Sequence, residues 1–261
     1  MQFFKSKLLR RVPSNDSKKK VYLTFNDGPN PQITPWVVEQ LKNAGGLKAT
    51  FFCIGENAEK YPELVNLLKS EGHEIANHSH RHESGWATSK KSYFRSFLEC
   101  ENTLGKTSHF RPPYGRITPN QAQALSTRTQ IVLWDVESGD YDTTKSGKEC
   151  LENLIKLTQP GSIIVFRDSE RAAPRLATET VGVRLRDRER RFLARRAGAD
   201  ATRLVGARVS TVGLVVCGAS LTGAVVDCPA RTADKPVPTA DAERRGFPAV
   251  VVDWAQTVTS T

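Results

Sequence analysis

The sequence predicts an α/β protein built on a parallel sheet, and two observations support this fold class. Short apolar runs typical of strands recur along the first 170 residues, and amphipathic helical patterns fall between most of them. This alternation favours a parallel sheet. Chemically capable side chains follow the C-terminal ends of these runs, the face on which β/α barrels assemble their sites.

We expect six strands, at residues 21–25, 49–54, 74–77, 109–111, 131–136 and 162–166. Helical spacing of apolar residues predicts helices over 33–41, 64–68 and 94–98. Trp36 keeps this spacing and is expected in the core, whereas Trp86 lies in a loop and is equally suited to stacking on a sugar ring.

The composition is that of an ordinary folded protein. The 261 residues are enough for one barrel or two small domains, and 38% hydrophobic and 25% charged residues are typical values. Five cysteines form no C-x-x-C pair, so free thiols are expected rather than a zinc ribbon or a disulfide framework. They are Cys53, Cys100, Cys150, Cys217 and Cys228.

Residues 1–19 form a basic extension without the apolar core of a signal peptide. No run approaches the ~18 apolar residues of a membrane-spanning helix. The sequence as written therefore predicts no transmembrane segment and a cytoplasmic location, and it leaves the oligomeric state open.

The strongest chemical signal is the run Val-Tyr-Leu-Thr-Phe-Asn-Asp-Gly-Pro at 21–29, followed by Asn-His-Ser-His-Arg-His at 77–82. The first is a strand that ends in an acid at a sharp turn. The second places His78 and His82 four residues apart. One carboxylate and two imidazoles are the ligand set of a catalytic zinc site with an open position.

With the Arg-Pro-Pro-Tyr-Gly turn at 111–115, these motifs resemble the polysaccharide deacetylase family, which has the NodB homology domain of carbohydrate esterase family 4. The resemblance covers residues 20–170 and implies a distorted β/α barrel. It implies a hydrolase that removes N-acetyl groups from N-acetylglucosamine-containing glycans of the peptidoglycan or chitin type. A divalent metal, zinc or cobalt, would be held by Asp27, His78 and His82.

The resemblance also implies roles for residues around the metal. Asn26 occupies the place of the general base, which Arg111 would orient, and the backbone amide of Tyr114 would stabilise an oxyanion. Glu137 is placed to pair with Arg111, and Asp140 is a second candidate for a supporting residue.

Both positions that transfer protons in the family are altered here. Asn26 replaces the expected aspartate, and an amide cannot take a proton from water. Arg167 replaces the expected acid histidine, and a guanidinium stays protonated. Because loss of a general base costs about 10²- to 10⁴-fold in rate, we expect a slow enzyme or, as the alternative, a metal- and carbohydrate-binding pseudoenzyme.

The composition changes near residue 170. Residues 171–261 have no Asn, Ile or Tyr and contain 14 Arg and one Lys against nine acids, which accounts for +6 of the net charge of +10. A frameshift or fusion would explain this Arg/Ala/Val-rich tail, and the barrel is expected to be incomplete or altered at its C-terminal end. Nucleic acid binding is not expected, because the basic run at 184–196 lacks interleaved aromatics, but a tail that binds an anionic partner stays open.

Overall fold

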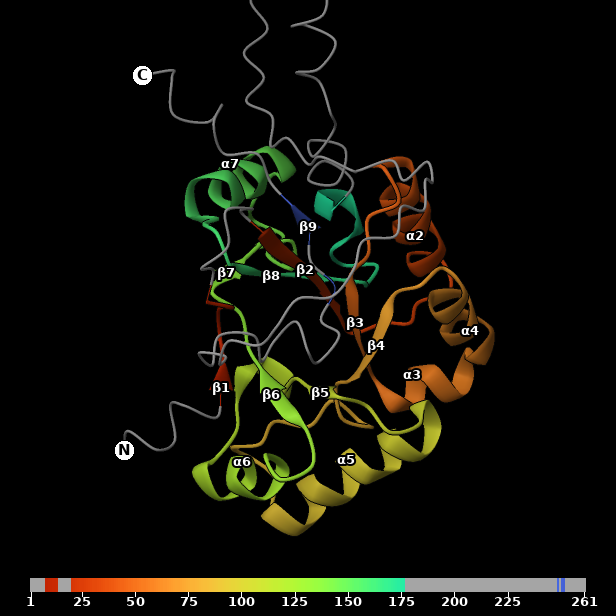
Figure 1. Ribbon diagram of the computed structural model, residues 1–261, viewed down its shortest axis with the longest axis vertical. Helices are drawn as coiled ribbons and strands as arrows, with labels where there is room; N and C mark the ends of the chain where they lie inside the picture. Colours follow the sequence, from red (N-terminus) through yellow and green to blue (C-terminus); the bar gives the residue numbers. More distant parts are fainter. Residues whose placement is uncertain (1–7, 14–19, 177–247, 249, 252–261) are drawn as a thin grey trace, which may run out of the picture.

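The structure, a computed structural model, describes residues 8–13, 20–176, 248 and 250–251. Eight parallel strands form a curled sheet in the order β1-β6-β5-β4-β3-β2-β8-β7 (Figure 1). They are β1 (Leu8–Leu9), β2 (Lys20–Asn26), β3 (Thr50–Cys53), β4 (Glu74–Asn77), β5 (His109–Phe110), β6 (Gln130–Val132), β7 (Val136–Glu137) and β8 (Ile163–Arg167). The predicted distorted β/α barrel is confirmed.

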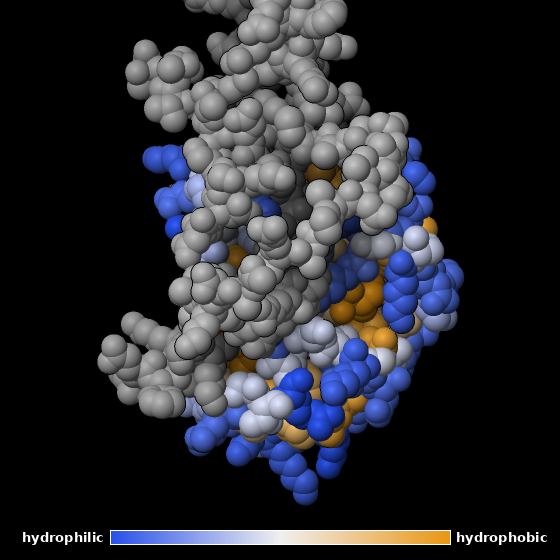
Figure 2. Space-filling view, viewed as in Figure 1, coloured by the Kyte–Doolittle hydropathy of each residue, from blue (hydrophilic) through white to orange (hydrophobic). Residues whose placement is uncertain are grey.

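Helices surround the sheet on its outer side (Figure 1). They are α2 (Thr34–Asn43), α3 (Gly55–Lys60), α4 (Pro62–Ser70), α5 (Lys90–Leu104), α6 (Pro119–Leu125) and α7 (Gly147–Leu157). Their outward faces are mostly hydrophilic, and hydrophobic residues show between them towards the sheet (Figure 2). None of the helices in the described part of the chain is long and apolar enough to cross a membrane.

The core forms where β2, β3 and β8 lie side by side. Phe25 stacks between Phe51 and Phe166, with ring centroids 5.0 and 5.3 Å apart. The parallel register sets Phe25 opposite both partners, so three neighbouring strands place aromatic rings on the same face. This packing fixes the ends of β2 and β8, which carry Asn26 and Arg167 into the site.

The strand predicted over 131–136 is wrong as a single element. The chain forms β6, leaves the sheet after Val132, and re-enters as β7 on the other side of β8. Asp135 lies at this crossing, where its carboxylate accepts hydrogen bonds from the Ile163 amide at 2.7 Å and the Ser162 hydroxyl at 2.9 Å. A partly buried acid within an apolar run therefore marks a break between two strands.

The N-terminal segment closes the gap between β6 and β8. Leu9 accepts a hydrogen bond from the Leu133 amide at 2.7 Å, and the Val12 amide donates to Gly161 at 2.9 Å. The Arg11 guanidinium meets Asp135 at 2.7 Å. Part of the predicted basic extension thus belongs to the sheet, a placement that its composition does not predict.

The beginning of the predicted tail packs on the barrel. Ala172 and Leu176 are buried, and the Arg175 guanidinium donates to the Asp140 carbonyl at 2.6 Å. Two runs of the tail, at 211–216 and 249–254, have strand-like sequences, and the first of them lies outside the described residues. Of the run at 249–254, Val250–Val251 forms β9, which pairs antiparallel with the start of β2.

Cys53 and Cys100 are buried free thiols, as predicted, and Cys150 is also buried. Cys217 and Cys228 lie outside the described residues.

We predict that Asp135→Ala destabilises the fold by about 2 kcal/mol or more, because it leaves buried donors of β8 without an acceptor. The control is Glu152→Ala, which removes an exposed carboxylate paired only with Lys148 and should change stability little. Urea unfolding of both variants tests this. Equal unfolding midpoints for Asp135→Ala and Glu152→Ala would show that the packing of the N-terminal segment between β6 and β8 does not depend on Asp135.

Candidate metal centre and active site

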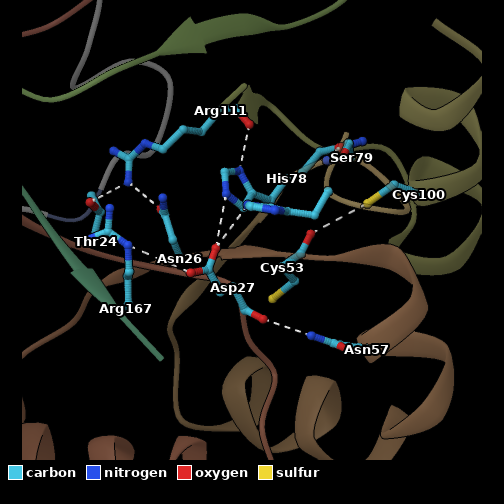
Figure 3. A network of polar contacts seen from close by, with 12 residues as sticks. Thr24, Asn26, Asp27, Cys53, Asn57, His78, Ser79, Cys100, Arg111 and Arg167 are labelled. Atoms are coloured by element: carbon cyan, nitrogen blue, oxygen red, sulfur yellow. Dashed lines mark hydrogen bonds and ion pairs between the residues drawn. The ribbon is translucent and has the colours of Figure 1, made fainter. Parts of the chain in front are cut away.

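The three predicted metal ligands lie together at the C-terminal edge of the sheet. Asp27 follows β2, and His78 and His82 follow β4. One ligand atom of each lies within 4.8 Å of the others. Oδ1 of Asp27 is 3.4 Å from Nε2 of His78 and 3.3 Å from Nε2 of His82. Figure 3 shows the Asp27 carboxylate pointing towards His78.

His78 is held in the tautomer that a metal ligand requires. Its Nδ1 lies 2.7 Å from the Arg111 carbonyl, and because a carbonyl only accepts, Nδ1 must carry the proton. Nε2 is then a lone-pair donor, and this buried atom has no hydrogen-bond partner among the described residues. Burial lowers the pKa of His78, which favours the neutral form that binds metals.

The electrostatics of Asp27 also suit a ligand. Burial by itself raises the pKa of this carboxyl, but the adjacent imidazoles of His78 and His82 outweigh burial and leave the pKa well below its usual range. Asp27 is therefore ionised at any ordinary pH. A carboxylate oxygen of Asp27 and one imidazole nitrogen each of His78 and His82 therefore form a donor set that fits a divalent cation such as zinc.

The backbone around this cluster is strained. Asp27, Ser79, His82 and Tyr114 all have φ between 57° and 74°. This left-handed region is costly for residues with a side chain and is found most often at functional sites. The surrounding hydrogen bonds hold these conformations; for example, the Asp27 carbonyl accepts from Asn57 at 2.8 Å.

Arg111 is completely buried beside the cluster. It donates to Thr24 at 2.7 Å and to Asn26 at 2.8 Å. Its other nitrogens donate to the carbonyls of Val132 and Leu133. Burial and the charge of Arg167 lower the pKa of Arg111. Because a guanidinium nevertheless stays charged, its burial costs free energy that these neutral acceptors only partly offset.

The Asn26 amide has one possible orientation. Arg111 can only donate, so it must be Oδ1 of Asn26 that accepts. The remaining NH₂ group donates hydrogen bonds and cannot remove a proton from water. Asn26 therefore lies next to the metal-ligand residue Asp27 and is held by Arg111.

Arg167 is enclosed by acids. Its guanidinium lies 3.0 Å from Glu137, 3.2 Å from Asp140 and 3.9 Å from Asp27. It also stacks 4.0 Å from the ring centre of Tyr141. The predicted pairing of Glu137 with Arg111 is wrong, because the cation at position 167 takes Glu137 instead.

Asp140, which the sequence predicted as a supporting residue of the metal site, contacts Arg167. One of its oxygens accepts from the Arg167 amide at 2.6 Å and the other from the guanidinium. Burial raises the pKa of Asp140 despite this cation.

Tyr114 begins the turn after β5 and reaches the metal-ligand cluster. It lies in the short 3-10 turn Pro113–Gly115, and its ring packs edge-on at 4.6 Å against the ring of His82. The turn therefore brings the Tyr114 ring against a metal-ligand residue. The role of the Tyr114 amide in oxyanion binding stays a prediction.

The other histidines lie outside this cluster. His109 bonds Glu74 at 2.5 Å, and His73 is buried with its Nδ1 3.3 Å from the Ala49 amide. His80 is also buried, and its backbone amide donates to Ser96 at 3.0 Å.

The sequence analysis missed Asp168, a buried acid directly behind the first turn. Its backbone amide donates to Asn26 at 2.8 Å, and its carboxylate accepts from Thr34 at 2.5 Å. It packs so closely on Gly28 that a Cβ there would come within 2.4 Å of its Oδ2. Burial raises the pKa of Asp168 to about 7. An acid directly after an apolar strand is the signal that could have indicated it.

Comparison with known proteins agrees with this geometry. The profile of a family described as polysaccharide deacetylase matches residues 14–129. A peptidoglycan-N-acetylglucosamine deacetylase of Bacillus cereus is 36% identical over 57% of this chain and 56% of its own length. A chitooligosaccharide deacetylase of Sinorhizobium fredii is 34% identical over 61% of this chain and 77% of its own length.

The fold agrees as well. A crystal structure of a peptidoglycan N-acetylglucosamine deacetylase in complex with a benzamide superposes with a TM-score of 0.62 and 29% identity, covering 69% of this chain and 88% of that one. The chain spans little more than half the length of the Bacillus cereus relative. A curled parallel sheet with an Asp-His-His cluster at its C-terminal edge defines a deacetylase-type hydrolase domain. The chain belongs to the polysaccharide deacetylase family.

We predict that His82→Ala lowers the affinity for zinc or cobalt by more than ~100-fold, since even groups behind metal ligands are worth 10- to 100-fold. Equilibrium dialysis with metal analysis measures this. Glu63→Gln, which removes an exposed carboxylate from α4, is the control and should bind metal like the parent. Unchanged affinity in His82→Ala would remove this histidine from the ligand set.

We predict that the contribution of Asp168 to the stability of the metal-free protein falls as pH rises from about 4 to about 7. In this window Asp168 holds a proton in the folded state and loses it in the unfolded state, so its titration makes folding take up a proton. The contribution of this residue is at most about 1.4 kcal/mol per pH unit. The unfolding free energy of the natural chain minus that of Asp168→Asn should therefore fall as pH rises through this window, and a constant difference would contradict the assignment.

Proposed function

We propose that this chain is a metal-dependent hydrolase that removes N-acetyl groups from an N-acetylglucosamine-containing glycan of the peptidoglycan or chitin type. This proposal rests on the convergence of Asp27, His78 and His82. Among the described residues, the buried Nε2 of His78 has no hydrogen-bond partner. The glycan class comes from the names of the relatives, a peptidoglycan and a chitooligosaccharide deacetylase.

The ligand residues would hold zinc or cobalt. When bound, such an ion polarises a carbonyl and lowers the pKa of a coordinated water. Asp27 supplies the anionic ligand, and the Arg111 carbonyl keeps Nε2 of His78 free by taking the proton of Nδ1. In this proposal the backbone amide of Tyr114 would stabilise negative charge on the acetyl oxygen.

Proton transfer is the weak part of this site. The side-chain NH₂ of Asn26 donates only, and Arg167 stays protonated because three carboxylates surround it. Burial alone would lower the pKa of Arg167, but the carboxylates of Asp140, Glu137 and Asp27 outweigh burial and raise it. We therefore assign slow turnover to the natural chain, lower than that of a deacetylase with an aspartate base by about 10²- to 10⁴-fold.

The enclosure of Arg167 favours a second candidate function. A guanidinium fixed by Glu137, Asp140 and Asp27 is a permanent cation where the family has an acid that transfers a proton. A chain with this site could bind metal and an acetylated glycan without hydrolysing it. The two candidates differ only in turnover, so rate and binding must be measured separately.

The test is acetate release from N-acetylglucosamine oligomers and from peptidoglycan, by the zinc- or cobalt-loaded natural chain and by an Asn26→Asp/Arg167→His double variant. The double variant restores an acceptor beside Arg111 and a titratable group beside Asp140. We expect at least about 100-fold faster release from the double variant.

The control adds His82→Ala to the double variant, which should abolish the gain. Full activity in the natural chain would show that another group acts as base. A double variant that is folded and metal-loaded but inert on all substrates, and that binds none of them, would contradict the deacetylase assignment.

A further inference from the structure

Two large aromatic side chains are exposed next to the metal-ligand cluster. Trp86 is 68% exposed and Tyr114 is 59% exposed, the highest values among the large hydrophobic residues that the structure describes. Trp86 lies in the loop after His82, and Tyr114 lies in the turn after β5. Two exposed rings beside a candidate active site indicate a surface that binds a ligand against the aromatic faces.

A cation lies against both rings. The guanidinium carbon of Arg116 is 5.1 Å from the ring centre of Trp86 and 5.7 Å from that of Tyr114. Among the described residues, no acidic oxygen comes within ion-pair distance of Arg116, whereas Arg81, Arg128 and Arg167 each have such a partner. Arg116 therefore presents an uncompensated positive charge between two aromatic side chains.

The loop that carries Trp86 is fixed to the segment that carries Arg116. The Gly85 amide donates to the Arg116 carbonyl at 3.2 Å, and Nε2 of Gln121 donates to the carbonyls of Gly85 and Thr88 at 2.9 and 3.0 Å. A Cβ at Gly85 would lie 2.5 Å from the Arg116 carbonyl, so this close approach requires glycine. The arrangement is preorganised, which reduces the entropy lost on binding.

This loop pair is continuous with the metal-ligand cluster. The Tyr114 ring contacts His82 on one side, at 4.6 Å, and Arg116 on the other. The sequence of contacts from His82 through Tyr114 and Arg116 to Trp86 leads outward from the ligands. A sugar next to the one that carries the acetyl group would lie over these residues.

We propose that Trp86 and Arg116 form a saccharide subsite next to the metal-ligand cluster, and that this subsite binds a sugar bearing a carboxylate. The indole ring suits the apolar face of a pyranose, and the unpaired guanidinium suits a carboxylate, which it can bind in bidentate geometry. A neutral polymer would use the ring and leave the cation unused. The inference rests on the proposed function for the position of the acetylated sugar.

Three oligosaccharides of similar length test the proposal on the full-length, zinc-loaded natural chain. One is a neutral N-acetylglucosamine oligomer, one alternates N-acetylglucosamine with a lactyl ether of the same sugar, and one alternates it with a uronic acid. Isothermal titration calorimetry gives each affinity, so no turnover is needed. The natural chain should bind at least one acidic oligomer about 10-fold more tightly than the neutral one, because a charge-assisted hydrogen bond contributes about 1.5–3 kcal/mol.

Arg116→Gln should remove this preference and leave the neutral affinity unchanged, whereas Trp86→Ala should weaken all three oligomers several-fold. The matched control is Arg95→Gln, an exposed arginine on α5, which should change nothing. If the oligomer with the lactyl ether loses affinity in Arg116→Gln, the carboxylate is that of the lactyl group. If the oligomer with the uronic acid loses affinity, the carboxylate is that of the uronic acid.

Equal binding of neutral and acidic oligomers, or an acidic preference that survives Arg116→Gln, would overturn the subsite while leaving the proposed function intact. Failure of all three oligomers to bind the natural chain would overturn the proposed function as well. Thermal melting of each variant confirms that the exposed substitutions leave the fold unchanged.

Discussion

The buried guanidinium of Arg111 is the interaction on which the site depends. It reaches from the end of β5 to side chains of β2 and to carbonyls at the end of β6, so one residue ties three strands together. Its guanidinium carbon lies 3.9 Å from the ring centre of Phe52 in β3. Through its own carbonyl, Arg111 also sets the tautomer of His78. The same residue therefore supports the sheet, the metal ligand and the position of Asn26.

This arrangement has an electrostatic cost. Removing one partner of a buried ion pair usually destabilises a protein strongly, because the remaining charge stays buried. Arg111 bonds only neutral acceptors, and Arg167 adds a second cation close enough to lower its pKa. Asp27, Glu137 and Asp140 pair with Arg167, and of these only the charge of Asp27 also acts on Arg111. The amide at position 26 thus affects stability as well as catalysis.

The sequence predicts much of this fold because the signals are local. An apolar run ending in a polar residue locates β2 and β4, and position at strand ends brings Asp27, His78 and His82 together. The helices α6 and α7 were not predicted, although each begins with a capping box, Thr118 with Gln121 and Ser146 with Glu149. Local reading could have found both.

Other features depend on tertiary contacts that no local pattern reveals. The segment containing Arg11 joins the sheet through backbone pairing with β6 and through Asp135, over a hundred residues away, which accepts its guanidinium. Glu137 could pair with either of two arginines, and only the three-dimensional structure shows that Arg167 is the nearer. The contact of Arg116 with Trp86 likewise joins two loops that the sequence leaves unrelated.

The metal ligands and the residues at positions 26 and 167 are positioned by different interactions. One group can therefore change without the other. The metal ligands are placed by backbone: the end of β2, the end of β4 and left-handed residues such as Asp27 and His82. The residues at positions 26 and 167 are placed by side-chain hydrogen bonds, and their backbone positions at the ends of adjacent strands are paired with each other. Exchange of those two side chains leaves the strands and the ligands in place. A chain of this kind can keep the metal-binding geometry while losing the groups that move protons.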